Sequence, residues 1–197
     1  MNCRRSPLHR SAGQQGSSLV VVLLILVVVT LLGAGAAQMS LLAERTSRAD
    51  RDRQIAFQAA EAALEDAFQD ITSARASLFK PGNRQGFPVN PGDCNTGTNR
   101  GLCLPSATNV PVWDSVNFTD TATNTATTAG LGDFTGRTSP SGTGSGLVPV
   151  QSPRYVIEIV KDRSPGSKAG AVIYRVTAMG FGPSANARVL LQGEFKN

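Results

Sequence analysis

The chain has 197 residues, of which 41% are hydrophobic and 17% charged, and its formal net charge is +5. Of its 19 basic side chains, three arginines lie within the first ten residues, so the rest of the chain carries 16 against 14 acidic ones. Aromatic residues make up only 6%, and no cluster of lysines and arginines alternates with them as in a nucleic-acid-binding stripe. The composition therefore predicts a solvated surface and no nucleic-acid partner.

A short basic leader precedes a long uncharged segment. Arg4, Arg5 and Arg10 lie in the leader, and no charged residue occurs from 11 to 43. The apolar run Leu19–Ala37 is roughly the 20 residues that a helix needs to cross a bilayer. Its basic leader lies on the side expected to stay cytoplasmic.

The place of cleavage decides what this apolar run does. A secretory signal peptide is cut after its apolar segment, and Ala34, Ala36 and Ala37 match such a site only weakly. Cleavage before the segment, after Gly16, would leave the apolar helix at the start of the mature chain. The run then continues without proline into charged residues, which favours the second alternative.

Residues 44–79 predict an amphipathic continuation of the same helix. Apolar side chains recur there at spacings of three, four and seven, as in a stripe that packs on a sheet. Lys80-Pro81-Gly82 is expected to end the helix. Glu61, Glu65, Asp66 and Asp70 fall mostly outside the stripe, whose members are Phe57, Ala60, Leu64, Phe68, Ile71 and Leu78.

The remaining chain divides into a loop-rich segment, 80–153, and a strand-like segment, 154–197. Gly, Pro, Ser, Thr and Asn dominate the first, with Val110-Pro111-Val112-Trp113 as its one apolar anchor. Trp113 is expected to pack on the domain core. Three β-branched and aromatic runs follow, at 154–160, 171–178 and 187–195. Short loops between them predict an antiparallel meander, and an α+β fold with the helix.

Two cysteines remain outside the leader, Cys94 and Cys103. A disulfide between them would close a loop of about ten residues and contribute about 2 to 3 kcal/mol in the chain-entropy model. An oxidising periplasm would permit it. Two cysteines nine residues apart without a partner histidine do not make a zinc site, so no metal is expected.

No active site is evident. The only histidine, His9, lies in the leader, which excludes histidine-based triads and metal sites from the mature chain. The Gly-rich stretch 142–146 lacks the lysine and the strand-to-helix context of a phosphate-binding loop. We therefore expect a non-enzymatic protein without a cofactor.

Two blocks of sequence resemble the opening of PilX-type minor pilins of type IV pili. Residues 14–26 read Gln-Gln-Gly-Ser-Ser-Leu-Val-Val-Val-Leu-Leu-Ile-Leu. Residues 52–67 read Asp-Arg-Gln-Ile-Ala-Phe-Gln-Ala-Ala-Glu-Ala-Ala-Leu-Glu-Asp-Ala. The second block is the more specific, because many membrane anchors match the first. A basic leader that ends in Gly before an apolar helix also resembles the class III signal of type IV pilins.

The resemblance implies how the chain is processed and where it works. A prepilin peptidase would remove residues 1–16 by cutting after Gly16, and the new amine of Ser17 would be methylated. The transmembrane helix, 17–43, would sit in the inner membrane with a periplasmic head, and the protein would later reach the pilus at the cell surface. The implied assembly surface opens with Ser17, Ser18, Leu19, Val20, Val21, Val22, Leu23, Leu24, Ile25 and Leu26.

The family resemblance also implies partners and a hinge. The partners would be the major pilin, other minor pilins and a large tip adhesin, in a fibre that supports twitching motility, adhesion or surface sensing. Pilin helices can unwind during assembly, and Gly33 and Gly35 are the corresponding hinge candidates here, because glycine weakens a helix by roughly 1 kcal/mol.

One departure from major pilins bears on position in the fibre. Major pilins carry Glu where this chain has Val21, and use it to pair with the N-terminal amine of the preceding subunit. A subunit without it is suited to go first, at the tip. A minor pseudopilin of a type II secretion system shares these features and stays an alternative, as does an uncleaved membrane anchor bearing a periplasmic binding head.

Overall fold

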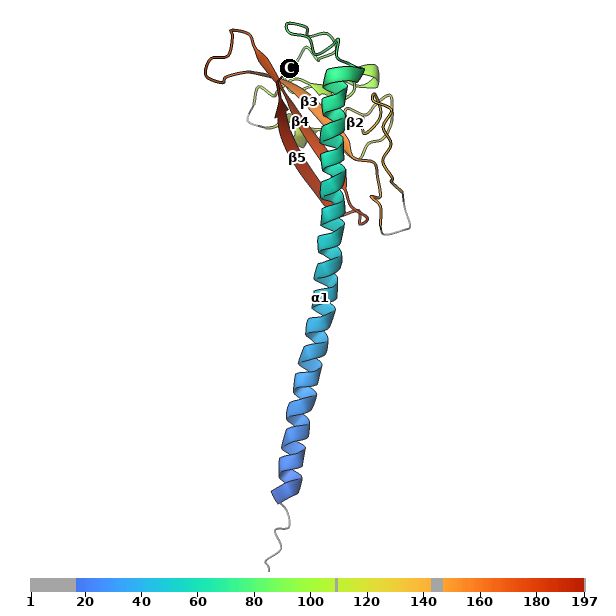
Figure 1. Ribbon diagram of the computed structural model, residues 1–197, viewed down its shortest axis with the longest axis vertical. Coiled ribbons are helices and arrows are strands. Elements are labelled where there is room, and N and C mark those ends of the chain that lie inside the picture. The colour runs from blue at the N-terminus through green and yellow to red at the C-terminus, as the bar shows by residue number, and fades with distance from the viewer. Residues whose placement is uncertain (1–16, 109, 143–146, 197) are drawn as a thin grey trace, which may run out of the picture. The chain divides into compact units, whose positions relative to one another are not determined.

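The computed structural model describes residues 17–108, 110–142 and 147–196. The predicted leader, with Gly16, lies outside the described residues. The chain forms two compact units that divide between Ser47 and Arg48. One helix, α1 (Ser17–Gln69), begins in the first unit and ends in the second (Figure 1).

The long helix ends earlier than the sequence predicted. A single π-helical turn, Asp70–Ala74, follows α1, and residues 75–79 form turns instead of continuing to Phe79. The backbone N–H of Arg75 donates to the Asp70 carbonyl at 2.9 Å, and its guanidinium binds the Asp70 carboxylate. This pairing turns the chain before the proline, so that Phe79 becomes fully buried.

Three long strands form the predicted antiparallel meander: β3 (Arg154–Lys161), β4 (Val172–Phe181) and β5 (Arg188–Phe195). Every residue of β3 has a partner in β4, from Arg154 opposite Met179 to Lys161 opposite Val172. The order β3-β4-β5 makes β5 an edge strand. The runs 154–160, 171–178 and 187–195 thus match the strands closely.

The 80–153 segment contributes more to the sheet than its composition predicted. It holds β1 (Leu102–Cys103), β2 (Ala129–Gly130), a 3₁₀ turn at Gly97–Asn99 and a short helix, α2 (Val112–Ser115). Both short strands pair with β3, β1 in parallel and β2 antiparallel. The sheet is therefore mostly, not wholly, antiparallel. The sequence did not predict β1 and β2, because two-residue strands are too short to show a hydrophobic pattern.

The helix face that packs on the sheet differs from the predicted stripe. Ala60, Leu64, Ile71 and Leu78 do pack in the core, but Phe57 and Phe68 are 43% and 40% exposed. The buried face is lined instead by small residues and is named the alanine face: Ala56, Ala59, Ala60, Ala63 and Ala67. Phe57 and Phe68 indicated the wrong face by their size, because close packing of a helix on a sheet favours small side chains.

Glycines in β4 and just after it explain why the small residues face inward. A Cβ at Gly180 would lie 2.0 Å from the Ala56 carbonyl oxygen and 2.4 Å from the Ala60 nitrogen. One at Gly182 would lie 2.5 Å from the Asp52 carbonyl oxygen. The helix backbone thus rests directly on the chain at these two positions, which only glycine permits.

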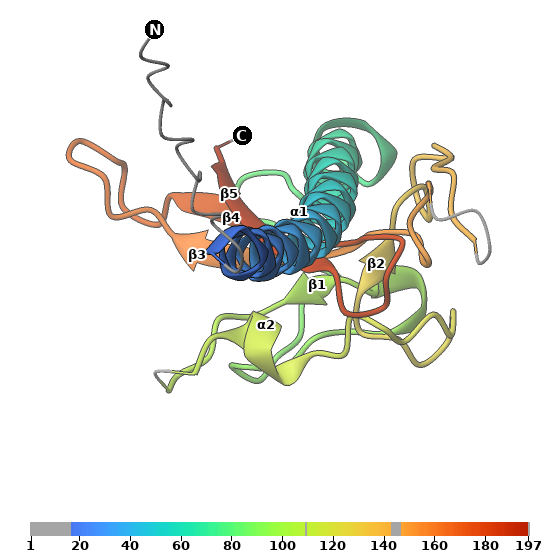
Figure 2. The same cartoon turned by 90° about the horizontal axis from the view of Figure 1, so that it is seen from below.

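The sheet separates two apolar clusters. Towards α1, Tyr155, Ile157, Tyr174, Val176 and Ala178 pack with the alanine face. On the opposite face a second cluster contains Cys103, Val112, Phe118, Val156 and Phe181, with Trp113 packed against it. Figure 2 shows α2 across the sheet from the green part of α1. Trp113 thus packs on the core as predicted, and the predicted α+β fold is confirmed.

Candidate functional site

The first unit presents an apolar helix surface on every side. Each apolar side chain from Leu19 to Leu32 is exposed, by 45% to 70%. The most apolar 18-residue window has a mean hydropathy of 3.0 and no buried residue. By length and composition this is the one helix in the described chain able to cross a membrane. A surface apolar all round requires a non-aqueous environment, which lipid or neighbouring helices can provide.

Several predicted site residues lie in this part of α1. Ser17 begins α1, and residues 18–26 follow within it in unbroken helix. Gly33 and Gly35 are also helical, and a Cβ at either would meet nothing within 4 Å. The structure therefore shows an intact helix at these glycines, and their role as a hinge stays a prediction.

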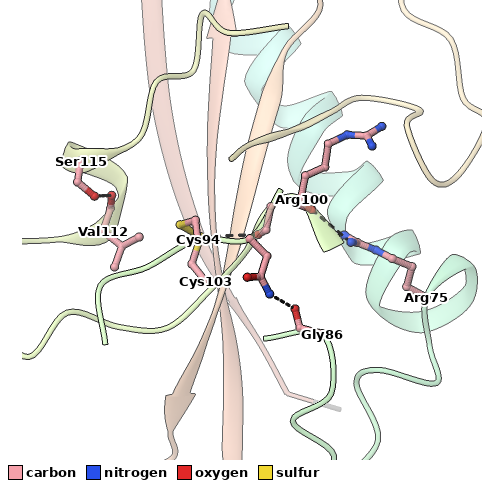
Figure 3. Close-up of a disulfide and its surroundings, with 9 residues drawn as sticks. Arg75, Gly86, Cys94, Arg100, Cys103, Val112 and Ser115 are labelled. Carbon is pink, nitrogen blue, oxygen red and sulfur yellow. Dashed lines mark hydrogen bonds between the residues drawn. A yellow bond between two sulfur atoms is a disulfide. The ribbon is translucent and has the colours of Figure 1, made fainter. Parts of the chain in front are cut away.

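The two cysteines of the head are joined by a disulfide. Cys103 belongs to β1 and is fully buried, and Cys94 forms a bridge to it across the loop. The Asn95 N–H donates to the Leu102 carbonyl at 3.0 Å. Figure 3 shows the disulfide between α2, which carries Val112, and the Arg75–Arg100 contact. The bond therefore holds the 94–103 loop on the sheet.

Two acidic residues, Asp66 in α1 and Asp70 in the π-helical turn after it, anchor the head loops to the helix. Asp66 and Asp70 are both fully buried on the alanine face. Asp66 accepts hydrogen bonds from the Gly132 N–H at 2.9 Å and from the Thr135 hydroxyl. Because buried carboxylates need partners to offset lost hydration, these contacts fix the 130–136 loop against α1.

Asp70 links the end of the helix to the central strand. It binds the Arg75 guanidinium and accepts a hydrogen bond from the Tyr155 hydroxyl at 3.0 Å. Burial, followed by the charge of Asp70, raises the pKa of Tyr155 well above its usual 10.0. Tyr155 thus stays neutral and remains a donor to Asp70.

Sequence reasoning missed both carboxylates as structural anchors. The available signal was their spacing, since Asp66 and Asp70 each follow an alanine of the buried face, Ala63 and Ala67, by three residues. Positions three and four apart share a helix face. An acidic residue on the same helix face as buried alanines is itself buried, and its carboxylate needs a hydrogen-bond donor from the segment that packs on that face.

No group of three potential metal-ligating side chains (His, Cys, Asp or Glu) gathers anywhere in the described ranges. Three acidic residues of the loop-rich segment, Asp114, Asp120 and Asp133, belong to no such group. Asp133 binds Arg100 at 2.8 Å, and Asp120 accepts a hydrogen bond from the Ala122 N–H at 2.9 Å within a turn.

An exposed apolar N-terminal helix that continues into a head packed on an antiparallel sheet defines a pilin-like subunit. Comparison with family models gives two matches: PilX N-terminal over residues 15–65, and type IV pilus assembly protein PilX, C-terminal, over residues 99–197. The chain belongs to the PilX family of type IV pilus assembly proteins. No curated protein and no solved structure gives a significant match.

Proposed function

We propose that this protein is a minor pilin that helps initiate a type IV pilus and sits at or near its tip. The observation that carries the proposal is the apolar surface of residues 19–32, exposed on all sides in a PilX-family chain. Such a helix can leave the bilayer only for another apolar environment, and the helical core of a fibre supplies one.

Processing is the first step of this function. A prepilin peptidase cuts after Gly16, leaving Ser17 with a free amine that is then methylated. Before assembly, residues 17–43 hold the protein in the inner membrane with its head in the periplasm. The oxidised Cys94–Cys103 pair agrees with that compartment. After assembly the protein belongs to the pilus at the cell surface.

Val21 supports a position at the leading end of the fibre. Its side chain is 52% exposed on the apolar helix, where major pilins carry Glu. Placing a carboxylate at the centre of a membrane helix costs about 2.5 to 3.5 kcal/mol on insertion scales. A pilin that keeps such a carboxylate therefore needs it for assembly. Without it, this subunit cannot pair with the N-terminal amine of a subunit ahead, and it is suited to go first.

The role is structural, and we propose no catalytic activity. The partners are other minor pilins, the major pilin and a large tip adhesin. Twitching motility, adhesion and surface sensing then follow from the assembled fibre. Residues 17–43 contribute the contacts within the fibre core, and the head, from Arg48 on, remains at the fibre surface.

The tip position is tested by placing a carboxylate on the helix. In Val21→Glu cells, we expect the protein to appear along sheared fibres in larger amounts than wild type, measured by quantitative immunoblotting and immunogold labelling. Val22→Glu is the matched control, with the same charge one residue away and no redistribution expected. An unchanged distribution of Val21→Glu contradicts the tip proposal.

A further inference from the structure

A small pocket lies on the face of the sheet opposite α1. Its volume is about 300 Å³, and its walls are the described part of the 105–113 segment together with Glu158, Arg175 and Gln192 from the three long strands. Trp113 contributes an aromatic wall, since it is only partly buried. The pocket thus combines an aromatic ring with charged side chains.

Glu158 is the unusual member of the pocket. It is only 3% exposed, and among the described residues its carboxylate forms no hydrogen bond or ion pair. Burial raises the pKa of Glu158 above its usual 4.5, and the opposing influence of Arg175 does not cancel this rise. The Glu158 oxygens are not among the fully buried side-chain atoms that lack a partner, so they are open to the pocket, where a donor from outside can bind them.

The nearby arginine does not fill this need, because it is already paired. Arg175 lies opposite Glu158 in β3 and opposite Glu194 in β5. Its Nε and Nη2 both donate to the Glu194 Oε1 at 3.2 Å. With Arg175 bonded to Glu194, the Glu158 carboxylate has no bonded cation among the described residues.

The size of the pocket limits the occupant. A volume of about 300 Å³ is at the lower end for small-molecule sites, so it suits one side chain better than a large ligand. A lysine or arginine offers the missing charge and an aliphatic stem that packs on aromatic and apolar walls.

We propose that the pocket formed by Trp113, Glu158, Arg175 and Gln192 binds one lysine or arginine side chain from a neighbouring pilus subunit. Only the source of the side chain rests on the proposed function. The pocket itself depends on the charge and geometry of the head.

The test uses Trp113, the single tryptophan of the chain, as its own reporter. The full chain in detergent micelles is titrated at pH 7.5 with N-acetyl-lysine amide and N-acetyl-arginine amide, with N-acetyl-norleucine amide as the uncharged control. We expect a saturable change in Trp113 fluorescence with the two cationic compounds, weakened by added salt. No change, or an equal change with the norleucine compound, overturns the proposal.

Variants separate a specific site from a general effect. Glu158→Gln is expected to weaken binding of the cationic compounds at least tenfold, whereas Glu65→Gln, which removes an exposed carboxylate of α1, leaves it unchanged. Val110→Lys places a cation at the rim and should compete with them. Far-ultraviolet circular dichroism would show whether Glu158→Gln is folded. If it is not, Val110→Lys serves as the variant that tests the pocket. Unchanged binding in the folded variants overturns the proposal.

The source of the side chain is tested in cells. If Glu158→Gln binds the cationic compounds poorly but enters fibres as wild type does, the pilus-subunit source is wrong. This outcome differs from a failure of the proposed function, in which the wild-type protein itself never enters fibres.

Discussion

Gly180 provides the sharpest test of how the helix meets the sheet. Gly180→Ala adds a methyl group that would lie 2.0 Å from the Ala56 carbonyl oxygen and 2.4 Å from the Ala60 nitrogen. Both contacts are with helix backbone, so no side chain can rotate to relieve them. The helix must move away by roughly 1 Å, which loosens packing along the whole alanine face.

The expected loss of stability follows from the size of this clash. Overpacking by one methyl group typically costs about 1 to 3 kcal/mol, and we place Gly180→Ala near the upper end because backbone must shift. With a urea m-value of about 1 to 3 kcal/mol per molar, the unfolding midpoint should fall by about 1 M or more.

Gly193→Ala is the matched control. Gly193 lies in β5, and an added Cβ there would have its nearest neighbour at 3.6 Å, in the Phe195 ring, which is an ordinary contact. We expect it to be neutral or to stabilise by a few tenths of a kcal/mol, up to about 1 kcal/mol. The assay is urea unfolding of the full chain in detergent, followed by Trp113 fluorescence. Equal midpoints for the two variants would refute the close approach of helix and strand.

Three further predictions concern the buried polar groups and the disulfide. Asp66→Asn should destabilise the head by about 2 to 4 kcal/mol, because two donors lose a charged acceptor, while the exposed Glu65→Gln should change the midpoint little. Reduction should lower the unfolding midpoint of wild type by an amount equivalent to about 2 to 3 kcal/mol, but leave Cys94→Ala/Cys103→Ala unaffected; equal sensitivity would contradict the assigned pairing. Because burial raises the pKa of Glu158, its ionised form destabilises the fold above that pKa, and the penalty disappears below the unfolded-state pKa. Glu158→Gln should therefore gain stability relative to wild type as pH rises from about 4.5, as measured by the difference between their urea midpoints. A difference that does not change with pH would show that the carboxylate is not desolvated.

The sequence was sufficient for the architecture because its strongest signals are long. Uncharged residues from 11 to 43 and three β-branched runs after residue 153 are each long enough to specify one kind of element. The order of the three long strands followed from their short connecting loops. The fold class and the meander were therefore predictable.

Tertiary contacts decided the features that were mispredicted. Phe57 and Phe68 suggested a helix face by their size, but Gly180 and Gly182 select the alanines, and this selection depends on residues more than a hundred positions away. The early end of α1 depends on the Asp70–Arg75 pair, which no helix-ending motif marks. Short strands such as β1 form because a disulfide and β3 hold them, not because of their own propensity.

The most direct measurement is the N-terminus and intact mass of the mature protein, taken separately from membranes and from sheared surface fibres. We predict a chain that begins at Ser17, carries one disulfide and is present in trace amounts in the fibres. A chain that begins at Met1 and is found only in membranes would contradict the assembly function and leave an anchored periplasmic head.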